Sequence, residues 1–224
     1  MSRVDIIQSD PTVPVGVFGA LLAEWQVPFH ICRPAVGEPL PAPGRAVIVL
    51  GGTMGVHDTA SHPFLLPVKS YMARAVAAGT PLLGICLGGQ LLAEVSGGLV
   101  NSRCRGEQGL ADIELTAAGL QDPLFAGIDR RFRAFQWHND SFTIPPGALH
   151  LAASAKCPGQ GFRIGNAWGL QFHPEVDREI VAAWARHNPS RPALIAAFAA
   201  HEPAHAELAG RILRNFFDVA RRAG

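Results

Sequence analysis

The stretch PLLGICLGGQLLAEVSGG, residues 81–98, decides the fold of this chain. Its first part is a continuous apolar run, which is typical of a strand buried on both faces. Its second part has helical spacing and ends at a pair of glycines. Cys86 stands between the two, with Gly84 before it and Gly88 and Gly89 after it. The segment therefore predicts a buried strand that turns sharply into a helix at a cysteine.

The residues before this stretch repeat the same alternation of strand and helix. The pattern predicts strands in VDIIQ (4–8), PFHICRP (28–34) and RAVIVLGG (45–52), and helices in GVFGALLAEW (16–25) and FLLPVKSYMARAVAAG (64–79). Such alternation favours a parallel sheet covered on both faces. We therefore expect an α/β fold, in which helices flank both faces of a mostly parallel central sheet.

The middle of the chain changes character, and its end is helical. Short strand-like segments occupy GLVNSR (98–103), ADIELT (111–116), FRAFQWHND (132–140), ALHLAASA (148–155), GFRIGN (161–166) and AWGLQFHPE (167–175). Helical patterns then cover residues 178–188 and 192–224. No internal repeat or low-complexity linker interrupts the chain, so we expect residues 1–224 to form a single domain.

Composition excludes several classes of protein. The chain has 48% hydrophobic and 17% charged residues, which suits a packed core better than a disordered tail. A net charge of +1 without a basic run argues against nucleic-acid binding. The N-terminus lacks an apolar signal core, and no apolar stretch reaches the roughly 20 residues that span a bilayer. We therefore expect no membrane contact. The four cysteines form no CxxC pair, so we expect no disulfide framework and a cytoplasmic protein.

Cys86 stands where a nucleophile elbow would place its reactive residue. In such an elbow a strained turn joins a strand to a helix, and glycines leave room for the folded backbone. The dipole of the following helix favours the thiolate, and the amide of Leu87 could donate to an oxyanion. A buried structural cysteine is the alternative. It suits Cys32, Cys104 and Cys157 better, because it leaves the glycines around Cys86 unexplained.

A second glycine turn, LGGTMG (residues 50–55), follows the predicted strand at 45–49. Paired glycines at a strand end can turn backbone amides toward a common point, which makes Gly52 a candidate second oxyanion donor. The turn lacks the GK[ST] ending of a phosphate-binding loop. An ordinary tight turn is the alternative for this segment taken alone.

A cysteine nucleophile needs a base, usually a histidine, and a group that orients the base. In GLQFHPEV (residues 169–176), His173 and Glu175 are two residues apart on an extended segment, so their side chains project together. Pro174 stiffens the backbone between them. This segment predicts His173 as the base and Glu175 as its orienting carboxylate.

Two other histidine segments compete for a role. His138 precedes Asp140 by two residues in WHND (137–140), so it is the rival base, although we expect it to form a pocket wall. HEPAH (201–205) matches the H-E-x-x-H zinc signature, which needs both histidines on one helix. Pro203 should break that helix and leave His201 outside it. We therefore expect no metal site there.

Together, GICLGGQLLAE (84–94), VLGGTMG (49–55) and GLQFHPEV (169–176) resemble the class I glutamine amidotransferases. The likeness is greatest to free-standing members related to the glutaminase half of GMP synthase. EQGLADIELT (107–116), DPLFAG (122–127) and WHND (137–140) also match that subgroup in order. The resemblance therefore runs through most of the chain, and its three chemistry motifs are specific in combination.

The resemblance implies a fold, a triad and a pocket. The fold would be flavodoxin-like, with an additional small antiparallel sheet. Cys86 would be the nucleophile, His173 the base and then the acid, and Glu175 the residue that orients the histidine. The amides of Gly52 and Leu87 would form the oxyanion hole. The substrate would contact Gln90, Trp137, His138 and Asp140, and neither a metal nor an organic cofactor is implied.

The implied reaction is hydrolysis of a γ-glutamyl amide, in glutamine or another γ-glutamyl compound, through a glutamyl thioester that releases ammonia or an amine. One alternative is a glutaminase subunit that delivers ammonia to a separate synthetase chain. Another is a non-catalytic binding or regulatory module on the same fold. A PfpI-like elbow-cysteine hydrolase would leave the His173 segment and Gln90 unexplained.

Three positions depart from the family's pattern. Gly89 stands where many members carry His, Thr53 replaces the usual Pro, and Asn139 replaces the commoner Gly. All three belong to predicted pocket loops and none is a triad residue. The departures therefore bear on the identity of the substrate.

Overall fold

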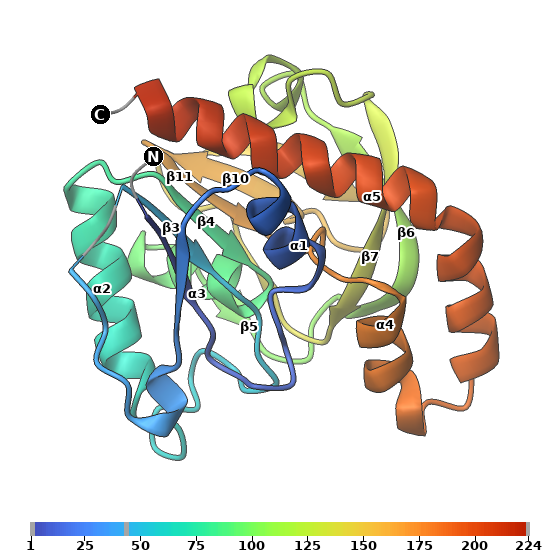
Figure 1. Ribbon diagram of the computed structural model, residues 1–224, viewed down its shortest axis with the longest axis horizontal. Coiled ribbons are helices and arrows are strands. Elements are labelled where there is room, and N and C mark those ends of the chain that lie inside the picture. The colour runs from blue at the N-terminus through green and yellow to red at the C-terminus, as the bar shows by residue number, and fades with distance from the viewer. Residues whose placement is uncertain (1–2, 43–44, 223–224) are drawn as a thin grey trace.

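A computed structural model describes residues 3–42 and 45–222 (Figure 1). Half of its main sheet consists of five parallel strands: β1 (Val4–Ile7), β2 (Phe29–Cys32), β3 (Ala46–Val49), β4 (Leu82–Ile85) and β11 (Ala167–Leu170). They lie in the order β2-β1-β3-β4-β11. All residues of β3, β4 and β11 are buried, which explains their unbroken apolar sequences. The carboxyl ends of these three strands meet side by side.

Antiparallel strands continue the same sheet beyond β11. They are β6 (Glu107–Leu115), β7 (Arg131–His138), β9 (Leu149–Ser154) and β10 (Gly161–Ile164), in the order β10-β9-β6-β7. A separate small antiparallel sheet pairs β5 (Val100–Asn101) with β8 (Ser141–Phe142). The expected small sheet is thus present, but most antiparallel strands extend the main sheet. The predicted α/β fold with a mostly parallel central sheet is confirmed.

Helices cover both faces of the main sheet (Figure 1). The α-helices are α1 (Gly16–Glu24), α2 (Leu65–Ala77), α3 (Leu87–Val95), α4 (Arg178–Trp184) and α5 (Arg191–Arg222). Short 3₁₀ helices are η1 (Pro34–Val36), η2 (Gly119–Gln121), η3 (Pro123–Phe125) and η4 (Ala185–His187). Alternate residues of β3 point to opposite faces: Ile48 packs in a cluster with α1 and α5, and Val49 in a cluster with α2 and α3.

The helix α5 continues through Pro203, so the expectation that this proline would end a helix is wrong. The ribbon of α5 instead bends sharply in its first half (Figure 1), as a proline inside a helix commonly requires. His201 Nε2 lies 3.3 Å from the carbonyl oxygen of Arg133, and His205 is buried. Among the described residues, no third metal-ligating side chain joins these two histidines.

All four cysteines are free thiols, and only Cys104 is partly exposed. Within residues 3–42 and 45–222, no helix combines the length and the apolar character that crossing a membrane needs.

Candidate active site

Cys86 occupies the turn between β4 and α3 in a strained conformation. Its backbone has φ 50° and ψ −108°, a region that residues with a side chain rarely adopt. Its amide donates a 2.7 Å hydrogen bond to the carbonyl oxygen of Leu170 in β11. The turn thus holds the thiol at the carboxyl edge of the sheet, as the elbow interpretation predicts.

The glycines around Cys86 allow backbone to pack directly on backbone. A β-carbon added to Gly84 would lie 2.4 Å from the carbonyl oxygen of Gly88. One added to Gly88 would lie 2.1 Å from the oxygen of Val49, and one on Gly89 would lie 2.6 Å from the oxygen of Leu170. Because these neighbours are backbone atoms, no side-chain rotation could relieve the contacts. A larger residue at any of the three positions would require the neighbouring backbone to shift.

His173 and Glu175 form a buried pair beyond the end of β11. Nδ1 of His173 lies 2.7 Å from Oε1 of Glu175, and the two side chains are 2% and 0% exposed. The amide of His173 donates to the carbonyl oxygen of Phe135. The chain bends at Gln171 and turns at Pro174 and Glu175, so this segment is not the extended one that the sequence predicts. The carbonyl oxygen of Glu175 accepts from the amide of Val17 at the start of α1. The structure therefore brings the two residues together as the spacing predicts.

The surroundings of His173 favour its charged form. Burial acts to lower the pKa of His173, but the negative charges of Glu175 and Cys86 outweigh burial and raise that pKa to about 10. The hydrogen bond with Glu175 acts in the same direction. Nε2 of His173 has no hydrogen-bond partner among the described residues, so it can give a proton to a departing amine.

Trp184 is a neighbour of His173 that sequence reasoning missed. Its ring meets the imidazole edge-to-face, with centroids 4.9 Å apart. Its Nε1 donates a 2.8 Å hydrogen bond to the carbonyl oxygen of Thr12, which fixes the indole in place. Trp184 lies in α4 beyond the motif, so neither spacing nor periodicity marked it. It leaves the imidazole little freedom to rotate.

Glu175→Gln is expected to lower turnover by about 10²- to 10⁴-fold while preserving the shape of the site. The amide cannot offset the imidazolium charge, so the pKa of His173 should fall. The alkaline limb of the pH–rate profile should therefore move to lower pH. Steady-state rates measured across a pH series check this. An unchanged alkaline limb would contradict the orienting role.

The glycine turn at residues 50–55 packs against Cys86 and against Leu87 at the start of α3. A β-carbon on Gly51 would lie 3.2 Å from Cε1 of His173 and 3.6 Å from Cβ of Cys86, so Gly51 packs against both side chains. Gly52 adjoins Leu87, whose Cδ2 would lie 2.7 Å from an added β-carbon. Among the described residues, neither the Gly52 nor the Leu87 amide donates to a protein acceptor. Both amides are therefore available to an oxyanion.

Asp10 holds the loop that carries Gly52. Its Oδ2 accepts from both the amide and the hydroxyl of Thr53, and its Oδ1 accepts from Thr12. Burial acts to raise the pKa of Asp10, but the hydrogen bonds from Thr12 and Thr53 lower it below its usual value. Asp10 follows β1, which sequence reasoning did not connect with the glycine turn. The carboxylate thus ties two loops together beside Cys86.

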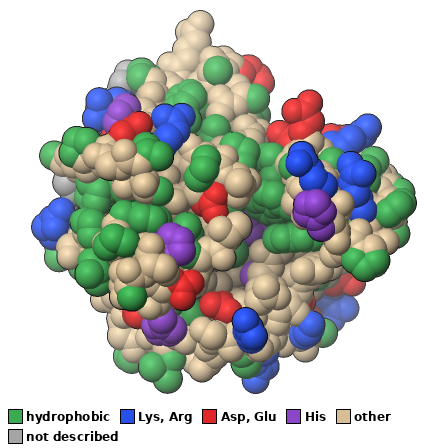
Figure 2. Space-filling model, turned by 90° about the horizontal axis from the view of Figure 1, so that it is seen from below, with side chains coloured by type: hydrophobic (Ala, Val, Ile, Leu, Met, Phe, Trp, Pro, Cys, Tyr) green, Lys and Arg blue, Asp and Glu red, His purple; other side chains and the backbone are tan. Residues whose placement is uncertain are grey.

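A cavity of about 680 Å³ opens above Cys86. Figure 2 looks onto the carboxyl ends of the parallel strands and shows a hollow near the middle of this face, with histidine side chains inside it. The predicted residues that line it are Gly52, Cys86, Gln90, Trp137, His138, Asp140 and His173. Glu175 lies behind His173 and is fully buried. The structure therefore gathers the candidate substrate residues around the candidate nucleophile.

His138 is paired differently from what its spacing suggested. Its Nδ1 lies 2.8 Å from the backbone carbonyl oxygen of Asp140, not from the carboxylate, which instead accepts from the amide of Arg103. Its Nε2 lies 3.4 Å from Oε2 of Glu107. With both ring nitrogens directed at protein oxygens, His138 suits a pocket wall better than a base.

Glu107, His138 and Cys157 form the one group of metal-ligating side chains within the described parts of the chain. Their ligand atoms lie within 4.8 Å of one another. The Glu107 carboxylate also accepts hydrogen bonds from Ser154 and from Nε2 of Gln160, the latter at 2.6 Å. Burial raises the pKa of Cys157 to about 11, which keeps its thiol protonated. Protein donors thus occupy the Glu107 carboxylate, whereas Nε2 of His138 has no hydrogen-bond partner among the described residues.

The comparison with known families decides the family of the chain. The sequence profile described as "Glutamine amidotransferase class-I" matches residues 39–180, which is well over half of the chain. The chain belongs to the class I glutamine amidotransferases. The matched region of this amidotransferase contains the glycine turn, the elbow and the His173–Glu175 pair.

Relatives and solved structures agree with this assignment. The amidotransferase is 34% identical over 177 residues to a GMP synthase [glutamine-hydrolyzing] from Thermomicrobium roseum, a match that covers 78% of this chain and 27% of the relative. It is 38% identical over 99 residues to a subunit of the GMP synthase from Thermococcus kodakarensis, covering 43% of this chain and 51% of that one. The chain thus matches about half or less of the length of these relatives.

A crystal structure of a glutamine amidotransferase from Thermotoga maritima superposes with a TM-score of 0.88. It is 29% identical in sequence, and the alignment covers 96% of this chain and 97% of that one. A glutamine amidotransferase from Methylobacillus flagellatus gives a TM-score of 0.84 at 26% identity. The architecture described above is therefore the architecture of the family.

Two departures of this amidotransferase from the family pattern have structural explanations. Thr53 gives Asp10 both an amide and a hydroxyl hydrogen bond, neither of which proline could donate. Gly89 packs against the backbone of Leu170, where a larger residue would need β11 to shift away from α3. Asn139 lines the cavity, and nothing in the structure explains its choice over glycine.

His205 of the amidotransferase is a buried residue of α5 near the segment that carries His173 and Glu175. It is 1% exposed, and its ring meets that of Phe198 edge-to-face at 5.0 Å. Burial lowers the pKa of His205 to about 4, and the nearby charge of His201 acts in the same direction. Neither ring nitrogen of His205 has a hydrogen-bond partner among the described residues. The folded protein therefore carries His205 neutral at pH 7.

Because the unfolded chain protonates His205 near pH 6.5, the unfolded state binds more protons than the folded state between about pH 6.5 and pH 4. His205 should thus contribute a fall of about 2 kcal/mol to the free energy of unfolding when the pH is lowered from about 7 to 5. Urea titrations at both pH values test this. In His205→Gln the fall should be smaller by the same amount, and an equal fall in both proteins would contradict the assignment.

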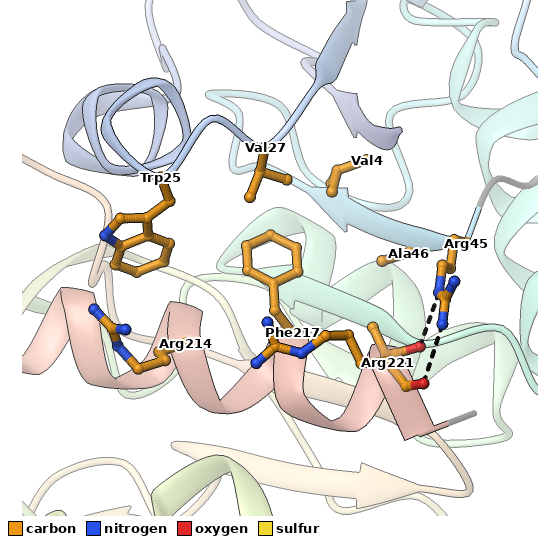
Figure 3. A pocket seen from close by; sticks show the side chains of 9 residues that line it. Val4, Trp25, Val27, Arg45, Ala46, Arg214, Phe217 and Arg221 are labelled. Carbon is orange, nitrogen blue, oxygen red and sulfur yellow. Dashed lines mark hydrogen bonds between the residues drawn. The ribbon is translucent and has the colours of Figure 1, made fainter. Parts of the chain in front are cut away.

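A second pocket of the amidotransferase lies at the opposite, amino end of the parallel strands (Figure 3). Its volume is about 360 Å³, and Val4 and Ala46, the first residues of β1 and β3, form part of its floor. Arg45 donates to the carbonyl oxygens of Ala220 and Arg221, and Arg214 lies over the ring of Trp25. The described lining contains no cysteine, histidine or carboxylate, unlike the cavity at Cys86.

Proposed function

We propose that this amidotransferase hydrolyses a γ-glutamyl amide bond through a thioester on Cys86. One observation carries the proposal: a thiol on a strained elbow lines the same cavity as His173, whose Nδ1 lies 2.7 Å from a buried carboxylate. A nucleophile, a base and an orienting group in this order match the logic of acyl-transfer catalysis. The substrate would be glutamine or another γ-glutamyl compound.

In the first step the Cys86 thiolate attacks the γ-carbonyl carbon. The negative charge that forms on the carbonyl oxygen is stabilised by the amides of Gly52 and Leu87. His173, held in its charged form by Glu175, gives its proton to the departing nitrogen. The carbon–nitrogen bond breaks, ammonia or an amine leaves, and a glutamyl thioester remains.

In the second step His173, now neutral, takes a proton from water as the water attacks the thioester. The carbon–sulfur bond breaks, glutamate is released, and the thiolate–imidazolium pair is restored. Glu175 keeps Nδ1 of His173 protonated throughout, so that Nε2 carries the moving proton. The net reaction consumes one water per amide bond and needs no cofactor.

Gln90, Trp137, His138 and Asp140 are proposed to hold the glutamyl part of the substrate. Gln90 uses its Nε2 group for bonds to the backbone of Asp140 and to Gln171. Among the described residues its Oε1 has no donor, so it can accept from an N–H group of the substrate. Residues 1–224 would act as a single domain, because the nine-stranded sheet draws strands from most of the chain. Four free thiols suit a reducing cytoplasm.

A second candidate is a glutaminase subunit that passes ammonia to a separate synthetase chain. Its support is the similarity to GMP synthases, one of which is described as one subunit of the enzyme. Both candidates share the chemistry at Cys86 and differ in whether the chain works alone. The non-catalytic alternative would leave the strained cysteine without a purpose.

Release of glutamate and ammonia by the purified chain tests these possibilities. Glutamine should be run beside a panel of γ-glutamyl dipeptides and γ-glutamyl amines, with Cys86→Ala as the control. Steady glutamate release from one substrate, absent in the control, supports a self-sufficient hydrolase and identifies the preferred leaving group. Covalent trapping of Cys86 by a glutamine-like electrophile without turnover favours the subunit. The absence of both turnover and trapping would contradict the proposed chemistry.

A further inference from the structure

A buried polar side chain outside the cavity lining reaches the sulfur of Cys86. Gln171 follows β11 and is fully buried. Its Nε2 donates to Sγ of Cys86 at 3.7 Å, a normal distance for a hydrogen bond to sulfur. Gln171 does not line the cavity, so it faces the nucleophile and not the substrate. Its orientation is set by the bonds that its neighbours make.

The first of these bonds meet at the backbone carbonyl oxygen of Asp140. That oxygen lies 2.8 Å from Nδ1 of His138 and 3.2 Å from Nε2 of Gln90. A carbonyl oxygen can only accept hydrogen bonds, and it has two lone pairs. Both neighbours must therefore direct an N–H group at it. The Gln90 amide is thus held with its nitrogen toward Asp140.

The Gln90 amide in turn orients Gln171. The remaining N–H of Gln90 Nε2 points to Oε1 of Gln171, 3.3 Å away. With its oxygen committed to Gln90, Gln171 can present only its nitrogen to the sulfur. Reversing either amide would set donor against donor or acceptor against acceptor in a buried place, which is costly. A continuous chain of bonds therefore runs from Asp140 through both glutamines to Cys86.

We propose that Gln171 is a further catalytic residue, which donates an N–H group to the Cys86 thiolate and is kept in that orientation by Gln90 and the Asp140 carbonyl. Hydrogen bonds to an ionised acceptor are stronger than those between neutral groups. The amide therefore favours the thiolate before attack and again when the thioester breaks. The His173 imidazolium supplies charge and a proton, whereas Gln171 supplies a fixed dipole. The role of Gln171 in turnover rests on the proposed function. The test below measures the reactivity of the Cys86 sulfur and does not depend on turnover.

The test is the rate at which iodoacetamide alkylates Cys86 as a function of pH, with the modified residue identified by mass spectrometry. Only the thiolate reacts, so the rate reports the sulfur without any turnover. In Gln171→Met, which removes the donor, the rate at neutral pH should fall about tenfold or more. The pH midpoint of the alkylation curve should also move upward. The alkylation rate at neutral pH should fall further in Gln171→Glu, which keeps the side-chain length but places a carboxylate beside the sulfur.

Two more variants complete the experiment. Gln90→Met leaves Gln171 in place but removes the bond that orients it, so it should lower the alkylation rate by a smaller factor. Gln136→Met removes a buried amide whose Nε2 bonds only to Gln160, and its rate should stay within about twofold of the parent. Thermal unfolding establishes that each variant is folded.

Unchanged alkylation curves in the folded Gln171 and Gln90 variants would overturn the inference, even if turnover fell. If Gln171→Met does not fold, Gln171→Glu and Gln90→Met decide the question. A parent protein that hydrolyses nothing in the substrate panel, yet whose alkylation depends on Gln171, would count against the proposed function and leave this inference standing.

Discussion

Cys86→Ala is expected to abolish turnover of every substrate that the parent protein hydrolyses, a loss of more than about 10⁴-fold. The proposed reaction passes through a covalent bond to Sγ, and no other sulfur of a cysteine lines the cavity within the described residues. Alanine keeps the β-carbon and leaves the glycine contacts of the elbow as they are. The free energy of unfolding should therefore change by less than about 1 kcal/mol. Glutamate release and urea unfolding measure the two quantities separately.

Cys104→Ala is the matched control for this variant. Cys104 is the most exposed of the four cysteines, and it lies in the segment before β6, outside the cavity lining. It should keep full turnover and the same stability. Appreciable activity in Cys86→Ala, or equal losses in both variants, would refute the nucleophile assignment.

Gly88→Ala is expected to destabilise the protein by about 3 kcal/mol or more. The added methyl group would lie 2.1 Å from the carbonyl oxygen of Val49 in β3. Only a movement of α3 away from the sheet could relieve this contact, and that movement would break the packing of Leu91 and Leu92. Urea unfolding at pH 7 gives the change directly. Folded Gly88→Ala protein should also have lower turnover than the parent, because the elbow that carries Cys86 would be displaced.

Gly210→Ala is the control for the effect of the methyl group itself. Gly210 lies inside α5, and no atom lies within 4 Å of an added β-carbon. Alanine favours a helix over glycine, so this variant should be more stable by about 1 kcal/mol. If both variants shifted stability in the same direction, the backbone contact at Gly88 would not be the cause.

The sequence was most informative where a local pattern has one physical solution. Three glycines around Cys86 predicted close backbone packing, and a β-carbon added to any of them would lie only 2.1 to 2.6 Å from a backbone oxygen. The two-residue spacing of His173 and Glu175 also predicted their pairing, which is present, although the chain turns at Pro174 and Glu175 and is not extended there. Such features depend on neighbours in the chain, which the sequence displays directly.

Other parts of the site depend on contacts between distant segments. Asp10, Gln171 and Trp184 come from three different elements, and none has a local pattern that marks it. A buried glutamine directly beside a catalytic motif was the one available signal, since a polar side chain at such a position needs a partner. Pro203 shows the opposite error, because tertiary packing keeps α5 continuous where local preference alone would end it.

The order β3-β4-β11 has a consequence for how such proteins can diverge. The candidate oxyanion turn, nucleophile and base follow three adjacent strands, so their separations are set by the roughly 4.8 Å spacing of a sheet. Trp137 and His138 instead lie at the end of β7, in the antiparallel half of the sheet, and Asp140 lies just after it. Insertions and substitutions in the antiparallel half can alter the substrate pocket. They leave undisturbed the parallel strands that set the spacing of the candidate oxyanion turn, nucleophile and base. Selection can therefore retune specificity in one half of the sheet while the other half preserves the chemistry.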